Sequence, residues 1–163
     1  MLVLSGLLAL AGGCDKPAPS ARPSGRPTQA QPKLPTLKLW LGAEEMTTEL
    51  ALTPVQVQTG MMFRTNMAEN ESMLFVFARP HQASFWMMNT ILPLSAAYIG
   101  PDGTILEIHD LQPHNTNSVT AGTDRVQFVL ETNQGWFRRH NVNIGAIVRT
   151  ERGSLQDTFL RKP

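Results

Sequence analysis

Short apolar runs separated by turn residues are the feature of this sequence that most restricts its fold. From Leu37 onward the runs either alternate apolar and polar side chains or are apolar throughout, as in Ser72 to Phe77, and Gly, Pro, Asn and Asp lie between them. Alternation is the period of a strand with one face toward a core, and short continuous apolar runs with aromatic residues are typical of buried strands. About eight such runs and two short helices predict a mainly β domain, built as an antiparallel sandwich or a jelly-roll-like barrel.

The positions of the expected elements follow from this pattern and from turn and capping signals. Thr53-Pro54-Val55-Gln56 has a capping residue, a proline at the first helical position and a glutamine three residues after the cap, so a short helix is predicted there, ending near Met62. A second short helix is expected between Asn133 and Asn141, and Pro101-Asp102-Gly103 predicts a hairpin turn. The largest apolar side chains gather at Phe85 to Leu94, and we expect the domain to be arranged around that segment. The predicted strands cover residues 37–41, 46–52, 72–77, 83–89, 94–99, 104–111, 125–131 and 146–150.

The N-terminal residues predict export. Met1 to Gly13 is an apolar run too short to span a bilayer as a helix, but suited to the hydrophobic region of a secretory signal. Its ending, Leu10-Ala11-Gly12-Gly13-Cys14, resembles the lipobox of bacterial lipoproteins, in which the cysteine is lipidated. Residues 1–14 are therefore predicted to be a signal peptide with a lipobox-like end, and lipidated Cys14 is predicted to anchor the exported protein to the membrane, on its periplasmic or cell-surface face. A signal peptide cleaved elsewhere is the alternative.

Residues 15–36 are predicted to be a disordered, proline-rich tether. They contain six prolines among small and polar residues, and they bury too little apolar area to offset the entropy of ordering. Their formal charge is +4 − 1 = +3, and since the whole chain carries +1, residues 37–163 carry +1 − 3 = −2. This mild acidity gives no reason to expect a nucleic-acid partner.

Residues 37–163 are expected to form one domain that lacks the motifs of several enzyme classes. Cys14 is the only cysteine, so this domain can form neither a disulfide nor a thiolate metal site, and thiol catalysis is excluded. No Gly-rich phosphate loop, zinc spacing or G-x-S-x-G motif is present, so we expect no cofactor and no metal. Six methionines between Met61 and Met88 could bind copper(I) through their thioethers, but core packing is the favoured interpretation. We expect a monomer.

Several stretches carry a family resemblance. They match, in order and spacing, the signature G-L-M-x-R, E-N-x-G-M-L-F-x-F, F-W-M-K-N-T-x-I-P-L-D and L-E-x-N-x-G-W-F followed by G-D. The matching residues are Gly60 to Arg64, Glu69 to Phe77, Phe85 to Ser95, Leu130 to Phe137 and Gly145-Ala146. Through them, the chain from about Leu50 to Thr150 resembles the bacterial and archaeal family called domain of unknown function 192.

The resemblance implies a single, mostly β domain of the jelly-roll-like sandwich kind, often exported, with no established activity for the family as a whole. Two positions depart from the signature, because Met88 replaces its lysine and Ser95 replaces its aspartate. Removing one partner of a buried ion pair costs several kcal/mol, about 3–5, whereas replacing both can be neutral. We therefore hypothesise that the signature lysine and aspartate form a pair that this chain has lost.

Glu107 and His109 are the candidate catalytic residues. They are two residues apart on a predicted strand and therefore share a face. A carboxylate and an imidazole on one face suit proton transfer or metal binding, and His114 in the following loop could join them. A solvated strand face is the favoured interpretation, since one face of an antiparallel sheet is expected to be polar.

A second set of residues is the candidate ligand-binding site. A guanidinium and side-chain amides near tryptophan rings could hold a small polar ligand, for example a sugar stacked on an aromatic face or a carboxylate. The alternative is structural, with the tryptophans in the core and the amides fixing turns. The predicted ligand-binding residues are Arg64, Asn70, Trp86, Asn89, Thr90 and Trp136.

These observations favour a non-catalytic binding or accessory module of the cell envelope that recognises a small polar ligand or an envelope protein. The alternative is a small hydrolase or metal-assisted enzyme that uses Glu107 and His109. A binding module should bring Arg64, Asn89 and a tryptophan into one pocket. An enzyme should bring Glu107 and His109 together in a cleft.

Overall fold

The computed structural model describes residues 25–161, so the predicted signal peptide, Cys14 and the first residues of the predicted tether lie outside it. Within these residues there are ten strands and three short helices. The strands are β1 (Thr36–Leu41), β2 (Glu44–Ala51), β3 (Glu71–His81), β4 (Ser84–Phe85), β5 (Leu94–Ile99), β6 (Ile105–Leu111), β7 (Val119–Thr120), β8 (Val126–Asn133), β9 (Val148–Thr150) and β10 (Gly153–Ser154). The helices are α1 (Pro54–Thr59), α2 (Trp136–Arg139) and α3 (Leu155–Phe159).

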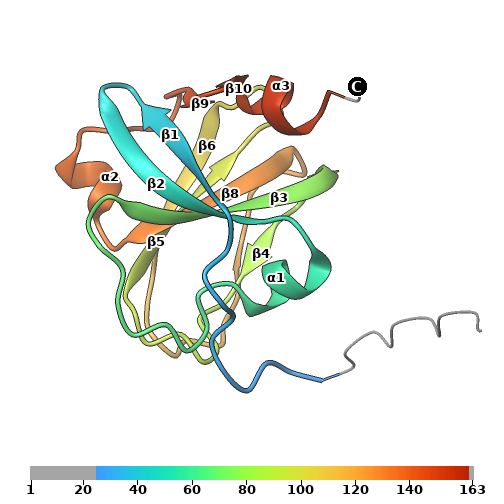
Figure 1. Cartoon of the computed structure of the whole chain (residues 1–163), viewed down its shortest axis with the longest axis vertical. Coiled ribbons are helices and arrows are strands. Elements are labelled where there is room, and N and C mark those ends of the chain that lie inside the picture. The colour runs from blue at the N-terminus through green and yellow to red at the C-terminus, as the bar shows by residue number, and fades with distance from the viewer. Residues whose placement is uncertain (1–24, 162–163) are drawn as a thin grey trace, which may run out of the picture.

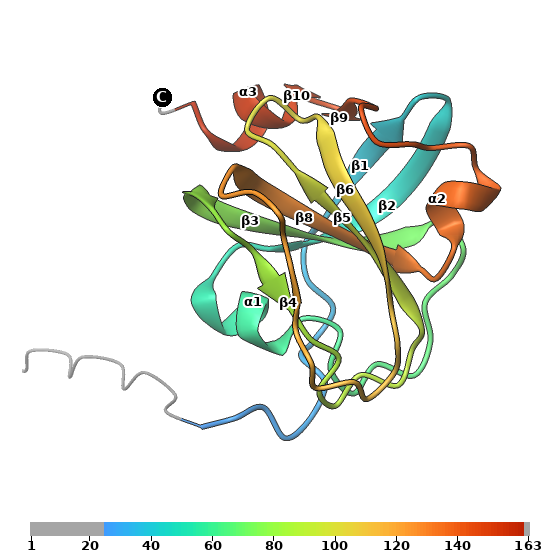
Figure 2. The same ribbon diagram turned by 180° about the vertical axis from the view of Figure 1, so that it is seen from behind.

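Eight strands form one large mixed sheet in the order β10-β9-β1-β2-β3-β8-β5-β6, and β4 pairs with β7 in a small second sheet. Figure 1 shows α1 beside β4, and α3 at the far end of the molecule beside β9 and β10; Figure 2 shows the same arrangement from behind. Every strand pair is antiparallel except β2 with β3. The predicted mainly β class is confirmed. The described part adds one parallel pair and a third short helix, and its large sheet is open rather than closed into a barrel.

Two features predicted from local sequence signals are present in the structure: the capping box at Thr53 and the turn at Gly103. Thr53 and Gln56 form a reciprocal capping box, in which the Gln56 amide nitrogen donates to the Thr53 hydroxyl and the Thr53 amide nitrogen donates to the Gln56 side chain, at 3.3 and 2.9 Å. Gly103 has a φ of 87°, and the Asp102 carboxylate accepts from the Thr104 amide at 3.0 Å, which closes the turn between β5 and β6.

At the centre of the large sheet, β5, β8 and the first half of β3 are buried on both faces. On β3, Leu74 packs with Trp136 and the β1 leucines, whereas its neighbours Met73 and Phe75 belong to a second apolar cluster with Tyr98. Because successive side chains of a strand point to opposite faces, these clusters lie on the two sides of the sheet. Residues 126–132 of β8 are all buried. Any polar side chain on β8 is therefore removed from bulk water.

The ordered domain begins before the predicted boundary at residue 37. Gln31 donates to the carbonyls of Gln56 and Gly60 at 3.2 and 2.9 Å, and the Leu34 amide donates to the Glu49 carboxylate at 2.7 Å. The end of the proline-rich segment is therefore fixed against α1 and β2 by side chains distant in sequence.

Two further segments differ from their predictions. The segment expected at the centre of the domain contributes only the two-residue strand β4 and then loops, and although Met87 and Leu94 are buried, Trp86 is 43% exposed. The centre is instead formed by β3, β8 and β5. The C-terminal tail, for which no element was predicted, forms α3, whose first residue Leu155 is fully buried and whose N-cap is Ser154. No helix in residues 25–161 has the length and apolar character needed to cross a membrane.

Candidate functional site

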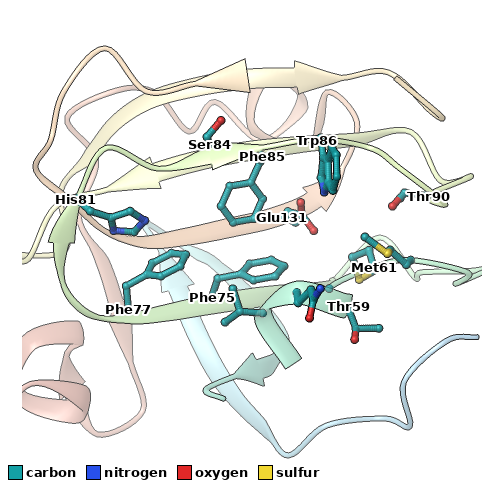
Figure 3. Close-up of a pocket in the computed structure, with 14 residues that line it drawn as sticks. Thr59, Met61, Phe75, Phe77, His81, Ser84, Phe85, Trp86, Thr90 and Glu131 are labelled. Carbon is teal, nitrogen blue, oxygen red and sulfur yellow. The ribbon is translucent and has the colours of Figure 1, made fainter. Parts of the chain in front are cut away.

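A pocket of about 220 Å³ lies between β3, the segment from Ser84 to Thr90, and the turn that follows α1. Figure 3 shows Phe75 and Phe77 pointing into it from β3, Phe85 and Trp86 approaching from the opposite side, and the Glu131 carboxyl between them. We call it the Glu131 pocket. It is smaller than the roughly 300–1,000 Å³ of pockets for drug-sized ligands, so it suits a small molecule.

Glu131 lies in the middle of an apolar layer. It pairs in register with Met73 of β3 and Ala96 of β5, two fully buried residues on the same face. The residue is only 4% exposed, and among the described residues no hydrogen bond or opposite charge reaches its carboxyl. Burial disfavours the charged form and raises the pKa of Glu131 to about 8. The carboxyl is therefore mostly protonated at neutral pH while the pocket is empty.

The aromatic wall of the pocket is a set of rings in edge contact. Phe85 packs edge-on against Phe75 with ring centroids 5.0 Å apart and against Phe77 at 6.4 Å, and it also approaches Tyr98 at 6.1 Å. His81 packs against Phe77 at 4.4 Å. Such contacts fix the ring orientations and leave apolar ring surface toward the cavity.

The opposite wall depends on a glycine. Gly60 has a φ of 47°, and a Cβ at this position would lie 3.2 Å from the Phe75 ring. Gly60 thus allows the turn after α1 to pass close over Phe75. Three residues further along this turn, the Phe63 amide donates to the carbonyl of Asn89 at 2.8 Å. This hydrogen bond joins the wall to the segment that carries Trp86.

Few ionisable side chains line the Glu131 pocket. Among the described residues that line the pocket there is no lysine or arginine, and Glu131 and His81 are its titratable groups. Tyr98 lies beyond the aromatic wall, where its hydroxyl donates to the carbonyl of Val119 at 2.6 Å. Burial, and then the nearby carboxyls of Glu131 and Glu107, raise the pKa of Tyr98 well above its usual value, so it remains neutral.

The predicted ligand-binding residues are only partly brought together. Trp86 and Thr90 line the Glu131 pocket, and Asn89 lies beside them with a left-handed φ of 57°. Trp136 is 2% exposed and belongs to the cluster on the other face of the sheet. Asn70 is exposed, and its carbonyl accepts from the Thr47 amide at 2.8 Å.

Arg64 lies outside the pocket, in a buried ion pair. Its guanidinium contacts the Glu49 carboxylate at 2.9 Å and the carbonyl of Pro32 at 3.2 Å. The predicted pocket of Arg64, Asn89 and a tryptophan is therefore not formed, because Arg64 pairs with Glu49 instead. The expectation failed because the two residues lie on separate elements whose proximity the sequence does not reveal.

Glu107 and His109 do share a face of β6, and their side chains lie 2.8 Å apart. The other oxygen of Glu107 accepts from the Gly122 amide at 2.8 Å, and the His109 ring lies 5.1 Å from that of Tyr98. Neither residue lines the Glu131 pocket. His114 is exposed, and within residues 25–161 no three His, Cys, Asp or Glu side chains are placed to hold a metal ion together.

Ser95 keeps a carboxylate partner despite replacing an aspartate of the family signature. It pairs in register with Asp110 of β6, to which its hydroxyl donates, and it accepts from the Gly135 amide at 2.8 Å. Asp110 therefore supplies a carboxylate next to the position where the signature has one. Met88 is half-buried, and its carbonyl accepts from the Thr90 hydroxyl at 3.3 Å. The lost ion pair remains a hypothesis.

Glu131 was not among the predicted site residues. It lies within the stretch that matches L-E-x-N-x-G-W-F, at the end of a predicted strand whose face of Val126, Phe128 and Leu130 does not include it. The available signal was a glutamate directly after the three apolar residues Phe128 to Leu130, which is unusual for a strand at the centre of a sheet.

Comparison with known proteins agrees with this fold. The chain belongs to the domain of unknown function 192 family, described as an uncharacterized ACR, whose model matches residues 38–150, more than half of the chain. This confirms the family resemblance. No curated protein matches the chain significantly.

Two solved structures are similar. One, a candidate transcription regulator from Sinorhizobium meliloti 1021, has 33% identity and a TM-score of 0.70, over 74% of this chain and 98% of that one. The other, a protein of unknown function from Novosphingobium aromaticivorans DSM 12444, has 29% identity and a TM-score of 0.68, over 85% of this chain and 99% of that one. Both support the fold, and neither assigns a chemistry to the pocket.

Proposed function

We propose that this protein is a non-catalytic binding module that holds a small molecule in the Glu131 pocket. The observation that carries the proposal is the Glu131 carboxyl, which belongs to a residue only 4% exposed, has no hydrogen-bonded or charged partner among the described residues, and lines a cavity walled by aromatic rings. A buried polar group without a partner costs free energy, about 1–3 kcal/mol, and such groups cluster at functional sites. A ligand would supply the missing partner.

The lining favours binding over catalysis. A reaction that uses general acid–base chemistry needs a proton donor or acceptor beside a second group that it orients or activates. No described group forms a hydrogen bond with Glu131, and the bonded pair Glu107 and His109 lies outside the lining. The pocket instead combines aromatic ring surface with a few polar side chains, Glu131 among them, a combination typical of recognition sites.

Thermal-shift screening of the full chain with small amines, sugars, alcohols and acids tests the proposal. Ligands that raise the melting temperature should lose about tenfold in affinity in Trp86→Ala, since Trp86 lines the pocket and stacking on an indole contributes on the order of 1–2 kcal/mol. Trp40→Ala is the matched control, because Trp40 is a half-buried tryptophan on β1 that does not line the pocket. Equal effects of both variants, or no hit at all, would count against the proposal.

We propose further that the protein acts in the cell envelope, exported and anchored through Cys14. The support is the lipobox-like sequence and the absence of other cysteines from the sequence. Cells fed an alkyne fatty acid should label the wild-type chain and leave Cys14→Ser unlabelled. Labelling of both, or of neither, would remove this part of the proposal. The near-neutral charge of the domain supports a ligand or envelope protein as its partner rather than nucleic acid.

The alternative function is a small hydrolase or metal-assisted enzyme, and it is favoured by the 2.8 Å contact between Glu107 and His109. If it holds, Glu107→Gln should abolish turnover of small ester or phosphoester substrates. If the binding function holds, that substitution should leave ligand affinity at the Glu131 pocket unchanged. The two outcomes separate the two functions.

A further inference from the structure

We infer that the ligand of the Glu131 pocket is a small organic cation, an alkylammonium ion whose positive charge pairs with the Glu131 carboxylate and lies against the aromatic rings. This inference rests on the proposed function and narrows it to one chemical class. It concerns the identity of the ligand, so it can fail while the binding function stands.

The charge of the pocket is the first reason to expect a cationic ligand. Glu131 is the one acidic residue among the described lining residues, and no lysine or arginine there competes for it. An ion pair in a site of low dielectric is much stronger than in water, provided that each charge has its partner. An anionic ligand would find no cationic lysine or arginine there and would be repelled by any ionised Glu131. A cation gains its counter-charge when the Glu131 carboxyl gives up its proton.

The rings carry the second step. Four aromatic side chains line the cavity: Phe75, Phe77, Phe85 and Trp86. Their faces carry partial negative charge, and a cation within about 6 Å of a ring centroid is stabilised by roughly 0.5–2 kcal/mol, most strongly by tryptophan. Pockets that combine several rings with one carboxylate are suited to methylated ammonium groups, whose surface is apolar and whose charge is spread out. Trp86, 43% exposed at one side of the pocket, is placed to contact such a group as it enters.

Proton balance gives the third step. When the cation enters a pocket whose carboxyl is protonated, the O–H bond of Glu131 breaks, its proton passes to solvent, and the carboxylate left behind pairs with the ammonium ion. One proton is therefore released for each cation bound at neutral pH, and affinity rises with pH until Glu131 is ionised in the free protein. The other titratable groups near this carboxyl are His81 of β3, which lines the same pocket, and Tyr98 of β5, with Glu107 of β6 beyond it.

Isothermal titration calorimetry of the full chain with choline and with its uncharged carbon isostere, 3,3-dimethylbutan-1-ol, tests the inference. Choline should bind at least about tenfold more tightly than the isostere at pH 8. Its affinity should fall by about tenfold per pH unit as the solution is acidified below the midpoint of Glu131. Titrations in two buffers of different ionisation enthalpy should show release of about one proton per choline at pH 7.

Glu131→Gln preserves the size and neutrality of the protonated side chain but cannot ionise, so it should fold normally, lose the preference for choline and show no proton release. Glu45→Gln, a substitution at an exposed carboxylate on β2, should change none of these values. Equal binding of choline and the isostere, unaffected by Glu131→Gln, would overturn the inference and leave the binding function intact. No binding of choline, with hits of other classes in the thermal-shift screen, would overturn it as well.

Discussion

Two glutamates of this protein are equally hidden from water and have opposite surroundings. Glu49 on β2 is 7% exposed and Glu131 on β8 is 4% exposed. The Glu49 carboxylate contacts Arg64 at 2.9 Å and Lys33 at 3.3 Å, and it accepts from the Leu34 amide at 2.7 Å. Among the described residues, Glu131 has neither a charged nor a hydrogen-bonded partner, and it borders a cavity.

The difference separates a structural carboxylate from a candidate functional one. The partners of Glu49 come from the N-terminal segment and from the loop after α1, so this carboxylate fixes those segments to the sheet. Glu131 holds no other segment against the sheet. Its burial costs free energy that an apolar residue at the same position would not lose. Proteins retain such costs where a ligand or a reaction uses them, which is the physical reason for placing the site at Glu131 rather than at Arg64.

The largest expected effect comes from breaking the satisfied carboxylate. Glu49→Gln should lower the free energy of unfolding by about 3–5 kcal/mol, because it leaves the buried Arg64 guanidinium without its counter-charge. Urea denaturation measures this. Replacing both partners, as Glu49→Leu with Arg64→Met, should recover most of the loss. A loss below about 1 kcal/mol for the single variant would mean that the pair is effectively solvated.

The same substitution at Glu131 should have the opposite sign, and its size should depend on pH. The folded-state pKa of about 8 lies above the usual glutamate pKa of 4.5, so the folded protein keeps a proton that the unfolded chain releases. Stability from this proton is fully present below about pH 4.5, is lost progressively as pH rises, and is gone above about pH 8. Relative to Glu131→Gln, the wild type should lose roughly 1 kcal/mol per pH unit, or roughly 2–3 kcal/mol from pH 5.5 to 7.5.

Urea denaturation of the two proteins at several pH values checks this prediction. Parallel pH profiles for wild type and Glu131→Gln would show that the carboxyl titrates alike in both states and would remove the contrast with Glu49. Glu49→Gln measured over the same range serves as the reference for a carboxylate that has partners.

The smallest effect is expected at an exposed carboxylate that has partners. Glu69 contacts Arg139 at 2.7 Å and His140 at 3.3 Å, and hydrogen bonding to Arg139 lowers the pKa of Glu69. Both members of the Glu69–Arg139 pair are about half exposed, so water screens the attraction. Glu69→Gln should change the free energy of unfolding by about 1 kcal/mol or less, and added salt should reduce the change further. A larger loss would show that removing the charge of a carboxylate with partners is destabilising even when the carboxylate is exposed to water.

Local pattern was enough to predict most strands, the Thr53 capping box and the turn at Gly103, because each depends on residues close in sequence. The parallel pairing of β2 with β3 was not predicted, since it depends on a connection through α1 rather than on a hairpin. Prediction of the site was limited in the same way, because its residues come from elements that are distant in sequence. Trp86 and Thr90, two of the predicted ligand-binding residues, do line the Glu131 pocket.

Arg64 and Glu131 could not be assigned to their roles from the sequence. Arg64 finds Glu49 fifteen residues away in the chain, through the packing of the loop after α1 on β2. Glu131 was not recognised as a site residue because the sequence does not show that β8 lies between β3 and β5 with both faces covered. Burial of a strand on both sides is a property of the whole sheet, so a charged residue in such a strand is recognised only once the strand order is known.

The most direct test of the account is an NMR titration of the glutamate side-chain carboxyl carbons, with the Glu131 signal assigned from its absence in Glu131→Gln. In the ligand-free full chain, Glu131 is expected to titrate with a midpoint at about pH 8. Saturating choline should move that midpoint downward, because the cation stabilises the carboxylate. If Glu131 without ligand instead titrated near pH 4.5, at the same pH as the exposed glutamates, this would contradict the central claim that its carboxyl is buried without a partner.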